Sequence, residues 1–540
     1  MRISSIFSDG MILQRNQETH IRGLYESGES ISALLDGNDL TVVQNEKELS
    51  FCIVVPAQHA GGPHQISISS QSVKQEIRDI LFGDVYVLGG QSNMELPLAL
   101  TTDEHLDEIE TADYPEIRHF EVPKVPLFGK KSDILEGGKW VKADQKDILG
   151  FSAIGFYFAK YKYLKDKIPV GLVQTAVGGA PVESLMSEEN LCRSMESLYP
   201  KYKDSGSCNK DKSKGCLWCY KDKLRVYSDP EYVAKTQKQD MEREQSWYEN
   251  LNKIDPGVQE HWENLWPEDI ETRAFTMPST FYKTDLENYK GSVWLQKIVE
   301  IPEDFSKERV QLRLGTLIDG DDTYVNGVRV GGWGFKYPPR RYWLEKNLLK
   351  PGKNVITIRL IINTNNIGGA VIETPYCLKG ETSEISLEGE WRMRIGANAT
   401  PAEGPTFFIW SPTALFNSML YPIRDLKCKA MLFYQGESNC DYPQYYGELL
   451  CDMVKEWRVL FGKETPFLMA EVTHWLGEGP VYDSDPFDGV REVQRKIVSE
   501  IPNAYLIKTY DLGWYNDLHP QNKKEVALRF LEVYENEGLG

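Results

Sequence analysis

The sequence has no apolar run long enough to cross a membrane and no excess of basic residues. A spanning helix needs about 20 consecutive apolar residues, and no stretch approaches that length. The chain has 61 Lys and Arg against 80 Asp and Glu, which gives a formal net charge of −19. Because an acidic surface repels phosphate groups, we expect neither nucleic acid nor an anionic membrane to be a partner.

Cysteines are few and irregularly spaced. The chain has nine Cys among 540 residues, an odd number that does not fit the paired framework of a disulfide-stabilised protein. The run Cys-Leu-Trp-Cys at residues 216–219 has the spacing that suits zinc. Two interpretations stay open, free thiols in an insertion or a structural zinc held by Cys192, Cys208, Cys216 and Cys219.

Length and composition indicate a folded protein of several domains. The chain is 41% hydrophobic and 11% aromatic, too apolar for a disordered protein. Its length suits about two to four domains. The amino terminus, residues 1–5, lacks the apolar core of a secretory signal, so we expect a cytoplasmic protein. A signal that had been removed would make it secreted or periplasmic instead.

One serine follows a short apolar segment at a place where chemistry often occurs. Residues 85–88 are expected to form a buried strand, and Ser92 follows in the run Gly-Gly-Gln-Ser-Asn-Met-Glu. Side chains just beyond strand ends in open α/β sheets line the ligand crevice. The run is not the Gly-x-Ser-x-Gly nucleophile elbow, because Met94 stands where its second glycine would be. Ser92 is therefore either a nucleophile or a helix cap.

A histidine and an aspartate share one loop near the carboxyl end. Asp517 and His519 lie in the run Asn-Asp-Leu-His-Pro, ahead of a helix expected over residues 522–534. A serine nucleophile needs a neutral imidazole to take its proton and a carboxylate to orient that imidazole. With only eight histidines in the chain, few others compete for the role of base. The alternative is that Asp517 caps the helix and His519 lies on the surface.

Two further expected strands lead into turns that carry glycine or amide side chains. Residues 169–174 precede Gly178 and Gly179, and residues 430–434 precede Gln435 and Asn439. Attack on an ester carbonyl creates a negative oxygen, which backbone N–H groups and side-chain amides stabilise. These turns are candidate walls of an oxyanion hole, although Gly-Gly pairs also make tight turns and asparagine makes Asx turns.

Four blocks, in order along the chain, carry these residues. They are Gly-Gln-Ser-Asn-Met-Glu at 90–95, Gly-Gly at 178–179, Tyr-Gln-Gly-Glu-Ser-Asn at 434–439 and Asp-Leu-His-Pro at 517–520. In this order they resemble the sialate O-acetylesterases of the SGNH (GDSL-like) hydrolase superfamily. The likeness extends to residues 6–14, 60–63 and 417–419, so it covers most of the chain outside the middle insertion.

The resemblance implies a role for each block. Ser92 would be the nucleophile and His519 the base, with the N–H groups of Ser92 and Gly179 in the oxyanion hole. The third block departs from the Gly-x-Asn-Asp pattern of many superfamily members, so either Gln435 or Asn439 would supply the amide donor. Substrate contacts are expected from further residues of the same blocks, Gln91, Asn93, Met94 and Glu437.

The acid of the triad is less clearly marked. Many SGNH enzymes place it three residues before the histidine, where this chain has Asn516. Asp517 is therefore the candidate acid. Glu437, Asp511 or a main-chain carbonyl would orient His519 if the carboxylate of Asp517 does not reach the imidazole.

The order of expected elements divides the chain into parts. Residues 1–80 alternate apolar and polar positions, which predicts a small N-terminal β domain. From residue 81 strands alternate with helices, which is typical of a parallel sheet covered on both faces. With the resemblance, this predicts an α/β fold, the three-layer αβα sandwich of SGNH hydrolases, in two segments at 81–265 and 396–540. The first segment ends in a charged helical insertion at about 200–265.

Residues 266–395 form a second β-rich part. Expected strands such as 310–314 and 355–360 are separated by Asn-Gly and Pro-Gly turns. This part resembles the inserted jelly-roll (β-sandwich) modules of glycoside hydrolases and related carbohydrate esterases, which often lie on sugar substrates. Trp333 and Tyr337 are then either sugar-stacking residues or core residues.

Together these observations predict a serine O-acetylesterase that acts on sugars and needs no metal or organic cofactor. The resemblance favours O-acetylated sialic acid as the substrate, with acetylated xyloglucan, xylan or mannan as the alternative. A carbohydrate-binding protein with a decayed esterase site is the alternative from another class. Filled catalytic positions argue against that last interpretation.

Overall fold

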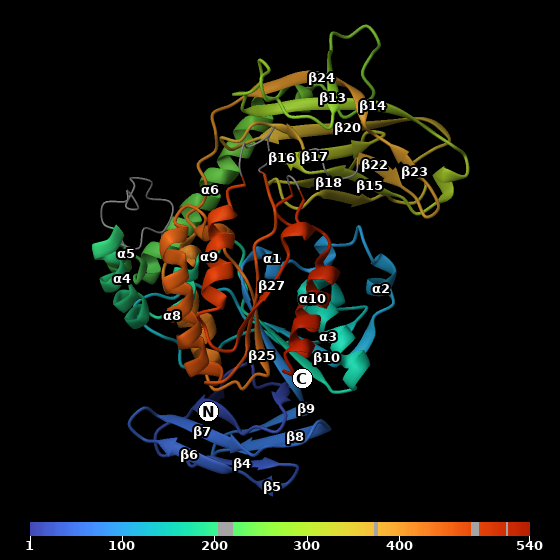
Figure 1. The fold of residues 1–540 in the computed structure, drawn as a ribbon. Coiled ribbons are helices and arrows are strands. Elements are labelled where there is room, and N and C mark those ends of the chain that lie inside the picture. The colour runs from blue at the N-terminus through green and yellow to red at the C-terminus, as the bar shows by residue number, and fades with distance from the viewer. Residues whose placement is uncertain (203–219, 372–375, 477–484, 515–516) are drawn as a thin grey trace.

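The computed structural model describes residues 1–202, 220–371, 376–476, 485–514 and 517–540. Three regions follow one another along the long axis of the molecule (Figure 1): an N-terminal β region, a central α/β region and a second β region. The second β region is an insertion, because the chain enters the central region both before and after it. Among the described residues, no helix has the length and apolar character needed to cross a bilayer.

Short antiparallel strands make up most of the N-terminal region, as the alternation of apolar and polar residues predicts. One sheet has the order β1 (Arg2–Ile3), β3 (Thr19–Leu24), β7 (Ser50–Val55) and β6 (Thr41–Asn45). Beside it, β4 (Ser32–Leu35) pairs with β5 (Asn38–Asp39) and with β8 (Gly61–Ser69). Every second residue of β3 and β7 is buried, which gives this region one apolar face.

A single long strand, β9 (Lys74–Gly90), joins the N-terminal and central regions. Its first part pairs with β8, and β2 (Ile12–Gln14) runs parallel to it over Leu81–Gly83. Its second part is the middle strand of the central sheet. The boundary expected between residues 80 and 81 thus falls inside one strand, because no proline interrupts the extended chain there.

The central sheet is parallel except at one edge. Its order is β11 (Trp140–Asp144), β10 (Asp113–Glu121), β12 (Val170–Gln174), β9, β25 (Ala430–Tyr434), β26 (Phe467–Ala470) and β27 (Ala504–Ile507). Only β11 is antiparallel to its neighbour. The strands expected from the sequence at 85–88, 169–174 and 430–434 are therefore three neighbours in one sheet.

Both faces of this sheet are buried under helices. Along β9, Val85 and Val87 belong to one apolar cluster, whereas Tyr86 and Leu88 belong to the other. This explains why the strand reads as a continuous apolar run. Figure 1 shows two groups of helices flanking the sheet. One group is α3 (Ala153–Asp166) and α10 (Lys523–Asn536); the other is α4 (Glu188–Tyr202), α8 (Pro443–Phe461) and α9 (Asp488–Val498).

The inserted β region is built from two larger sheets and one short strand pair. A six-stranded sheet has the order β13 (Arg273–Met277), β24 (Gly389–Asn398), β14 (Gly291–Ile301), β20 (Gly352–Ile362), β17 (Gly320–Val325) and β18 (Val328–Trp333). A four-stranded sheet has the order β19 (Arg340–Trp343), β15 (Gln311–Gly315), β22 (Tyr376–Lys379) and β23 (Glu384–Ser386). The pair is β16 (Leu317–Ile318) with β21 (Gly369–Ala370). One apolar cluster joins the two larger sheets.

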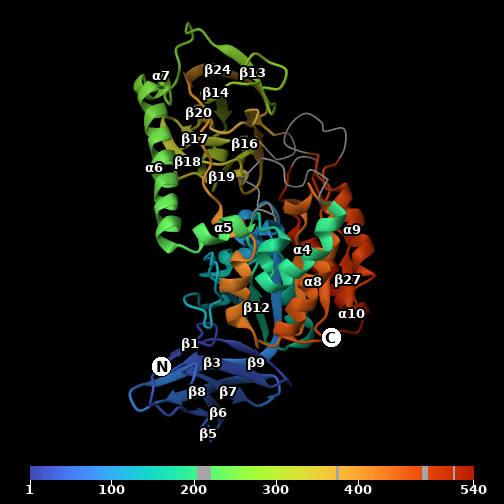
Figure 2. The same ribbon diagram turned by 90° about the vertical axis from the view of Figure 1, so that its left-hand side faces the viewer.

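The charged helix expected before this region is α6 (Pro230–Ile254). Asp229 caps it by accepting a hydrogen bond from the Glu231 N–H, and Pro230 occupies its first turn. Most of its side chains are exposed, as the mixed charges predict, but Leu251 packs with Ile361 of the six-stranded sheet. Figure 2 shows the helix lying alongside that sheet. The helix therefore belongs structurally to the inserted β region.

Candidate active site

The first three blocks meet at the carboxyl ends of β9, β12 and β25. The Val177 N–H donates to Gly90 O at 3.1 Å, and the Gln91 N–H donates to Tyr434 O at 2.8 Å. Gly90 has φ +120°, and a Cβ there would lie 2.0 Å from Tyr434 O. Only glycine fits this close approach of two strands. The parallel order of the sheet thus gathers segments that are far apart in the sequence.

Ser92 begins the one-turn helix α1 (Ser92–Glu95) at this edge and remains partly exposed. A Cβ built on Gly178 would lie 3.7 Å from Ser92 Cβ, so the second block borders the serine. In the part of the chain that the structure describes, the N–H groups of Ser92 and Gly179 have no hydrogen-bond partner. Gly179 has φ +73°, and a Cβ there would meet the Trp410 ring at 2.5 Å. These two N–H groups are free to bind a negative oxygen.

The fourth block reaches the serine through Asn93. The Asn93 Nδ2 donates to Leu518 O at 3.1 Å. Ser92 and His519 are the chain neighbours of these two residues, so the hydroxyl and the imidazole are carried by loops in direct contact. Ser92 Oγ and His519 make no hydrogen bond here, which is common in unliganded catalytic sites.

His519 has the properties of a neutral base. Its Nε2 is shielded from solvent and has no hydrogen-bond partner among the described residues. Burial lowers the pKa of His519 to about 3, and the positive charges of Lys523 and Lys336 add to the effect. The imidazole is therefore neutral at pH 7 and able to accept a proton from a hydroxyl.

Asp517 is held differently from a triad acid. Its Oδ1 accepts a hydrogen bond from the backbone N–H of His519 at 2.8 Å, and its Oδ2 has no partner among the described residues. Burial raises the pKa of Asp517. The carboxylate thus shapes the loop rather than binding the imidazole, as short Asp side chains in turns often do. Of the alternatives, Asp511 is bound to Arg529 at 2.6 Å, and Asn516 lies outside the described residues.

The two expected amide donors of the oxyanion hole are engaged, fully or in part, by other acceptors. Gln435 Nε2 donates to Asn439 Oδ1 at 2.6 Å and to Ala180 O at 3.3 Å. Asn439 Nδ2 donates to Glu183 Oε2 at 3.0 Å. Both hydrogens of the Gln435 amide and one of Asn439 are therefore engaged in holding the second and third blocks together.

All four expected substrate contacts are buried side chains, and two of them, Met94 and Gln91, hold the site together. Met94 is fully buried in the apolar cluster beneath α1, so its role is packing. Gln91 is 3% exposed, and its Oε1 accepts from the N–H groups of Gly436 and Ser438 at 3.4 and 3.3 Å. Adjacent residues of a helical turn point about 100° apart, so Met94 packs inward while Ser92 remains partly exposed. Gln91 links the first and third blocks instead.

Asn93 and Glu437 belong to a buried polar cluster that includes Lys523, a residue the sequence analysis missed. Asn93 Nδ2 donates to Glu437 Oε1 at 2.6 Å, and Lys523 Nζ donates to Asn93 Oδ1 at 2.7 Å. Burial lowers the pKa of Lys523 to about 8, while the carboxylates of Asp517 and Glu437 favour its charged form. A lysine at the first position of α10 opposes the helix dipole, and this was the signal of a special role.

The inserted β region also reaches the site. The ring of Tyr337 lies edge-on to the His519 imidazole, with ring centroids 4.7 Å apart and planes at 77°. Tyr337 lies between β18 and β19, and its neighbour Trp333 is 48% exposed. Neither aromatic residue belongs to the apolar core of the β region. The interpretation of Trp333 and Tyr337 as core residues is therefore excluded.

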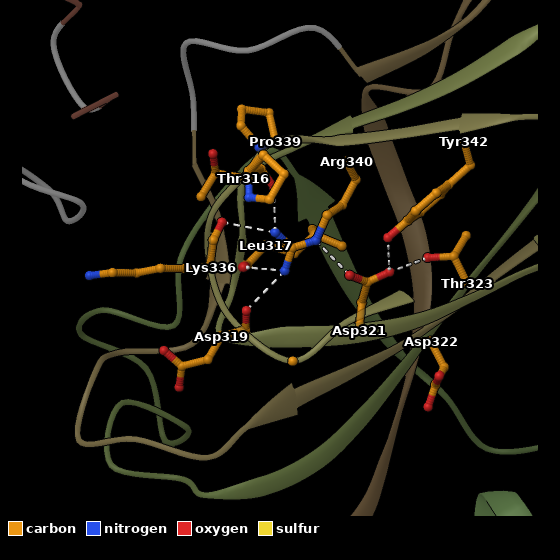
Figure 3. A network of polar contacts seen from close by, with 12 residues as sticks. Thr316, Leu317, Asp319, Asp321, Asp322, Thr323, Lys336, Pro339, Arg340 and Tyr342 are labelled. Atoms are coloured by element: carbon orange, nitrogen blue, oxygen red, sulfur yellow. Dashed lines mark hydrogen bonds and ion pairs between the residues drawn. The ribbon is translucent and has the colours of Figure 1, made fainter. Parts of the chain in front are cut away.

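Arg340 fixes the backbone on both sides of Tyr337. Figure 3 shows the hydrogen bonds of its guanidinium. Its guanidinium is fully buried, and every one of its N–H groups is used. The acceptors are Asp321 Oδ1 at 2.5 Å, Lys336 O at 2.8 Å, Pro338 O at 2.7 Å, Leu317 O at 3.0 Å and Asp319 O at 2.9 Å. Because Lys336 and Pro338 flank Tyr337, this network determines where the tyrosine lies relative to His519.

We expect Arg340→Met to lower the free energy of unfolding by about 3–5 kcal/mol, because it leaves the buried Asp321 carboxylate without its counter-charge. Urea unfolding followed by tryptophan fluorescence measures this loss. Arg329→Met is the matched control, since Arg329 pairs with Asp322 but is 56% exposed. An exposed pair of this kind contributes at most about 1 kcal/mol. Equal losses of unfolding free energy in the two variants would contradict the stabilising role given to the buried Arg340–Asp321 pair.

The expected zinc site lies mostly outside the described residues. Cys208, Cys216 and Cys219 all fall within 203–219, and Cys192 alone is described, in α4. In the described ranges, no group of three or more His, Cys, Asp or Glu residues is arranged to hold a metal ion.

Part of the chain is similar to known proteins. The family described as "Carbohydrate esterase, sialic acid-specific acetylesterase" matches residues 399–531, which include the third and fourth blocks. The sialate O-acetylesterase of Mus musculus is 24% identical over 206 residues, 35% of this chain and 38% of that protein. The human sialate O-acetylesterase is 23% identical over 207 residues, 35% of this chain and 39% of that protein.

These relatives are matched only in part, and a solved structure extends the likeness. The chain spans less than two-fifths of the length of the curated relatives it matches. A carbohydrate acetylesterase from Xanthomonas citri has the same fold over 99% of this chain and 74% of that one, with a TM-score of 0.55 and 19% identity. Residues 399–531 are thus similar to the sialic acid-specific acetylesterases, and the whole chain shares its fold with a carbohydrate acetylesterase.

Proposed function

We propose that this protein is a serine O-acetylesterase that removes acetyl groups from sugars. The observation that carries the proposal is the contact between the Ser92 and His519 loops, made by Asn93 and Leu518. Beside it lie the free N–H groups of Ser92 and Gly179 and the neutral, unpartnered His519 Nε2. A nucleophile, a base and an oxyanion hole are the parts that acyl transfer requires.

The proposed reaction has two steps. Ser92 Oγ attacks the acetyl carbonyl while His519 takes its proton, and the N–H groups of Ser92 and Gly179 bind the negative oxygen. The sugar oxygen then leaves with the proton from His519, so that an acetyl-serine remains. Water, activated by the same imidazole, releases acetate. Each step uses residues of the chain and water, and we propose no cofactor.

A carboxylate near the imidazole would stabilise the charge that His519 gains. Asp517 is the nearest candidate by sequence, and it needs to turn Oδ2 toward the ring. Its Oδ2 is buried and has no partner in the described structure, so this rotation would break no hydrogen bond of Oδ2. Asn439 would supply the third oxyanion donor through its second N–H, which no described group accepts.

We also propose which known folds the central region and the inserted region adopt. The central region, with a parallel sheet between two groups of helices, fits the αβα sandwich of SGNH hydrolases. The two facing sheets of the inserted region fit a jelly-roll module.

O-acetylated sialic acid is the first candidate substrate, because the matched family and the mammalian relatives are named for it. Acetylated hemicelluloses are the second candidate, favoured by the inserted β region that reaches His519. The third possibility is a protein that only binds sugars. The presence of Ser92 and His519 at the expected catalytic positions argues against it.

An acetate-release screen separates these candidates. The wild-type protein is incubated with 9-O-acetylated sialic acid, acetylated xyloglucan, acetylated xylan and acetylated mannan, and free acetate is measured enzymatically. We expect release from one class at a rate at least about tenfold above the others. 4-Nitrophenyl acetate serves as the reference for esterase chemistry, and no hydrolysis of any of these esters would overturn the proposed function.

A further inference from the structure

A cavity lies in the inserted β region, and Ser92 and His519 are not among the residues that line it. It measures about 170 Å³ and is lined by residues of α6, β17, β18 and β20. Ligand pockets for drug-sized molecules are usually about 300–1,000 Å³. A cavity of this smaller size suits a single ring rather than a large cofactor.

Aromatic and hydrogen-bonding side chains line the cavity together. Trp333, 48% exposed, and Tyr248 supply the aromatic surface. Asn252 and Asp322 supply amide and carboxylate groups, and Arg329 and Arg359 supply guanidinium groups. The flat face of an aromatic ring suits the C–H face of a sugar, while paired donors and acceptors suit its neighbouring hydroxyls.

Arg359 is only partly satisfied by the protein. Its Nε donates to Asp255 Oδ2 at 2.8 Å and its Nη1 to Asn252 Oδ1 at 2.7 Å. Its Nη2 is buried and has no hydrogen-bond partner among the described residues. A charged donor that is withdrawn from water and left unpaired is costly, so an acceptor oxygen beside Arg359 would be stabilising.

The charges around the cavity balance, which argues for a neutral ligand. Asp322 Oδ1 accepts from Arg329 Nη2 at 2.8 Å, and Arg359 pairs with Asp255. Asp321, which also lines the cavity, is neutralised by Arg340 at 2.5 Å (Figure 3). An anion would find no excess positive charge here, whereas a polyhydroxylated ring needs none.

We propose that this cavity is a sugar-binding subsite that holds an uncharged pyranose unit of the same carbohydrate chain from which the acetyl group is removed. The proposal rests on the proposed function for the identity of that chain. Trp333 borders the cavity and Tyr337 contacts His519, so four residues of backbone connect the two sites. Such a segment reaches at most roughly 14 Å. A short oligosaccharide therefore spans both, and the protein prefers acetylated oligosaccharides to acetylated monosaccharides.

Calorimetric titration of the full chain tests the subsite without turnover. In the Ser92→Ala background, we expect xyloglucan heptasaccharide, xylotetraose or 3′-sialyllactose to bind with measurable heat. Trp333→Ala or Asn252→Ala added to this background weakens binding at least about tenfold. The matched control is Trp343→Ala, which removes a tryptophan of the same region that is 42% exposed and does not line the cavity. It leaves the affinity unchanged.

Two outcomes overturn the subsite: none of the three oligosaccharides binds, or Trp333→Ala binds as tightly as its parent. The hydrolysis of 4-nitrophenyl acetate by proteins that retain Ser92 tests the esterase function separately from the sugar-binding subsite. We expect Trp333→Ala to hydrolyse this small ester within about twofold of the wild type. Trp333-dependent binding without any esterase activity supports the subsite and removes the proposed function. Esterase activity without oligosaccharide binding removes the subsite alone.

Discussion

Ser92→Ala is expected to lower kcat for 4-nitrophenyl acetate by at least about a thousandfold. The hydroxyl forms the covalent bond to the acetyl group in the proposed reaction, and no other side chain of α1 can replace it. Met94 is buried, and Glu95 Oε2 accepts a hydrogen bond from the Gly178 N–H. Some activity above that of water remains, because the oxyanion hole is intact.

Ser418→Ala is the matched control for this substitution. Ser418 lies in another segment that resembles the family, but its hydroxyl only donates to Ala414 O at 3.0 Å. Its loss leaves kcat within about twofold of the wild type. Mass spectrometry after a brief reaction provides a second readout, since only a chain with Ser92 can carry the acetyl group. Equal rates for Ser92→Ala and the wild type would remove the esterase assignment.

His519→Ala is expected to lower kcat by a similar factor, at least about a thousandfold. Without the imidazole, Ser92 has no base among its described neighbours that is neutral and unpartnered. Added imidazole restores part of the rate, because the substitution leaves a space beside Tyr337 and Asn93 holds the adjoining backbone. His20→Ala, which removes a histidine of the N-terminal region bound to Glu18, is the control and retains full activity.

The pH profile of the wild type tests the same base. The base acts in its neutral form, and burial lowers the pKa of His519 to about 3. Protonation of a base with a lowered pKa begins only at acidic pH, so kcat/KM holds steady from pH 8 down to about pH 5. A half-maximal rate near pH 6.5, the ordinary value for histidine, would show that the imidazole in the working enzyme is not the buried one described here.

Much of the central region was predictable because parallel sheets leave strong local patterns. The strand before Ser92 is buried on both faces and therefore reads as an uninterrupted apolar run. Its neighbours at residues 169–174 and 430–434 gave the same pattern, and their carboxyl ends meet as the topology requires. The start of α3 (Ala153–Asp166) also has a local signal, because the Ser152 side chain caps the helix.

The parts that could not be predicted depend on contacts between distant segments. Nothing near Tyr337 in the sequence indicates that it touches His519, because that contact is set by how the inserted β region lies on the central one. The amides of Gln435 and Asn439 were expected in the oxyanion hole from their place after a strand and from the family resemblance. Two of their acceptors, Ala180 O and Glu183 Oε2, lie in the segment that follows β12. Local sequence patterns around residues 435–439 do not indicate these contacts.

The continuity of β9 has a consequence for how this protein can be dissected. Leu81 hydrogen-bonds to Met11 O, and Ile6, Phe7 and Phe82 share one apolar cluster with Phe433 of the central sheet. A fragment that starts at residue 81 would expose that cluster and leave an open strand edge, which invites aggregation. The first eighty residues therefore support the strand that leads to Ser92, and we expect a fragment of residues 81–540 to lose the proposed activity.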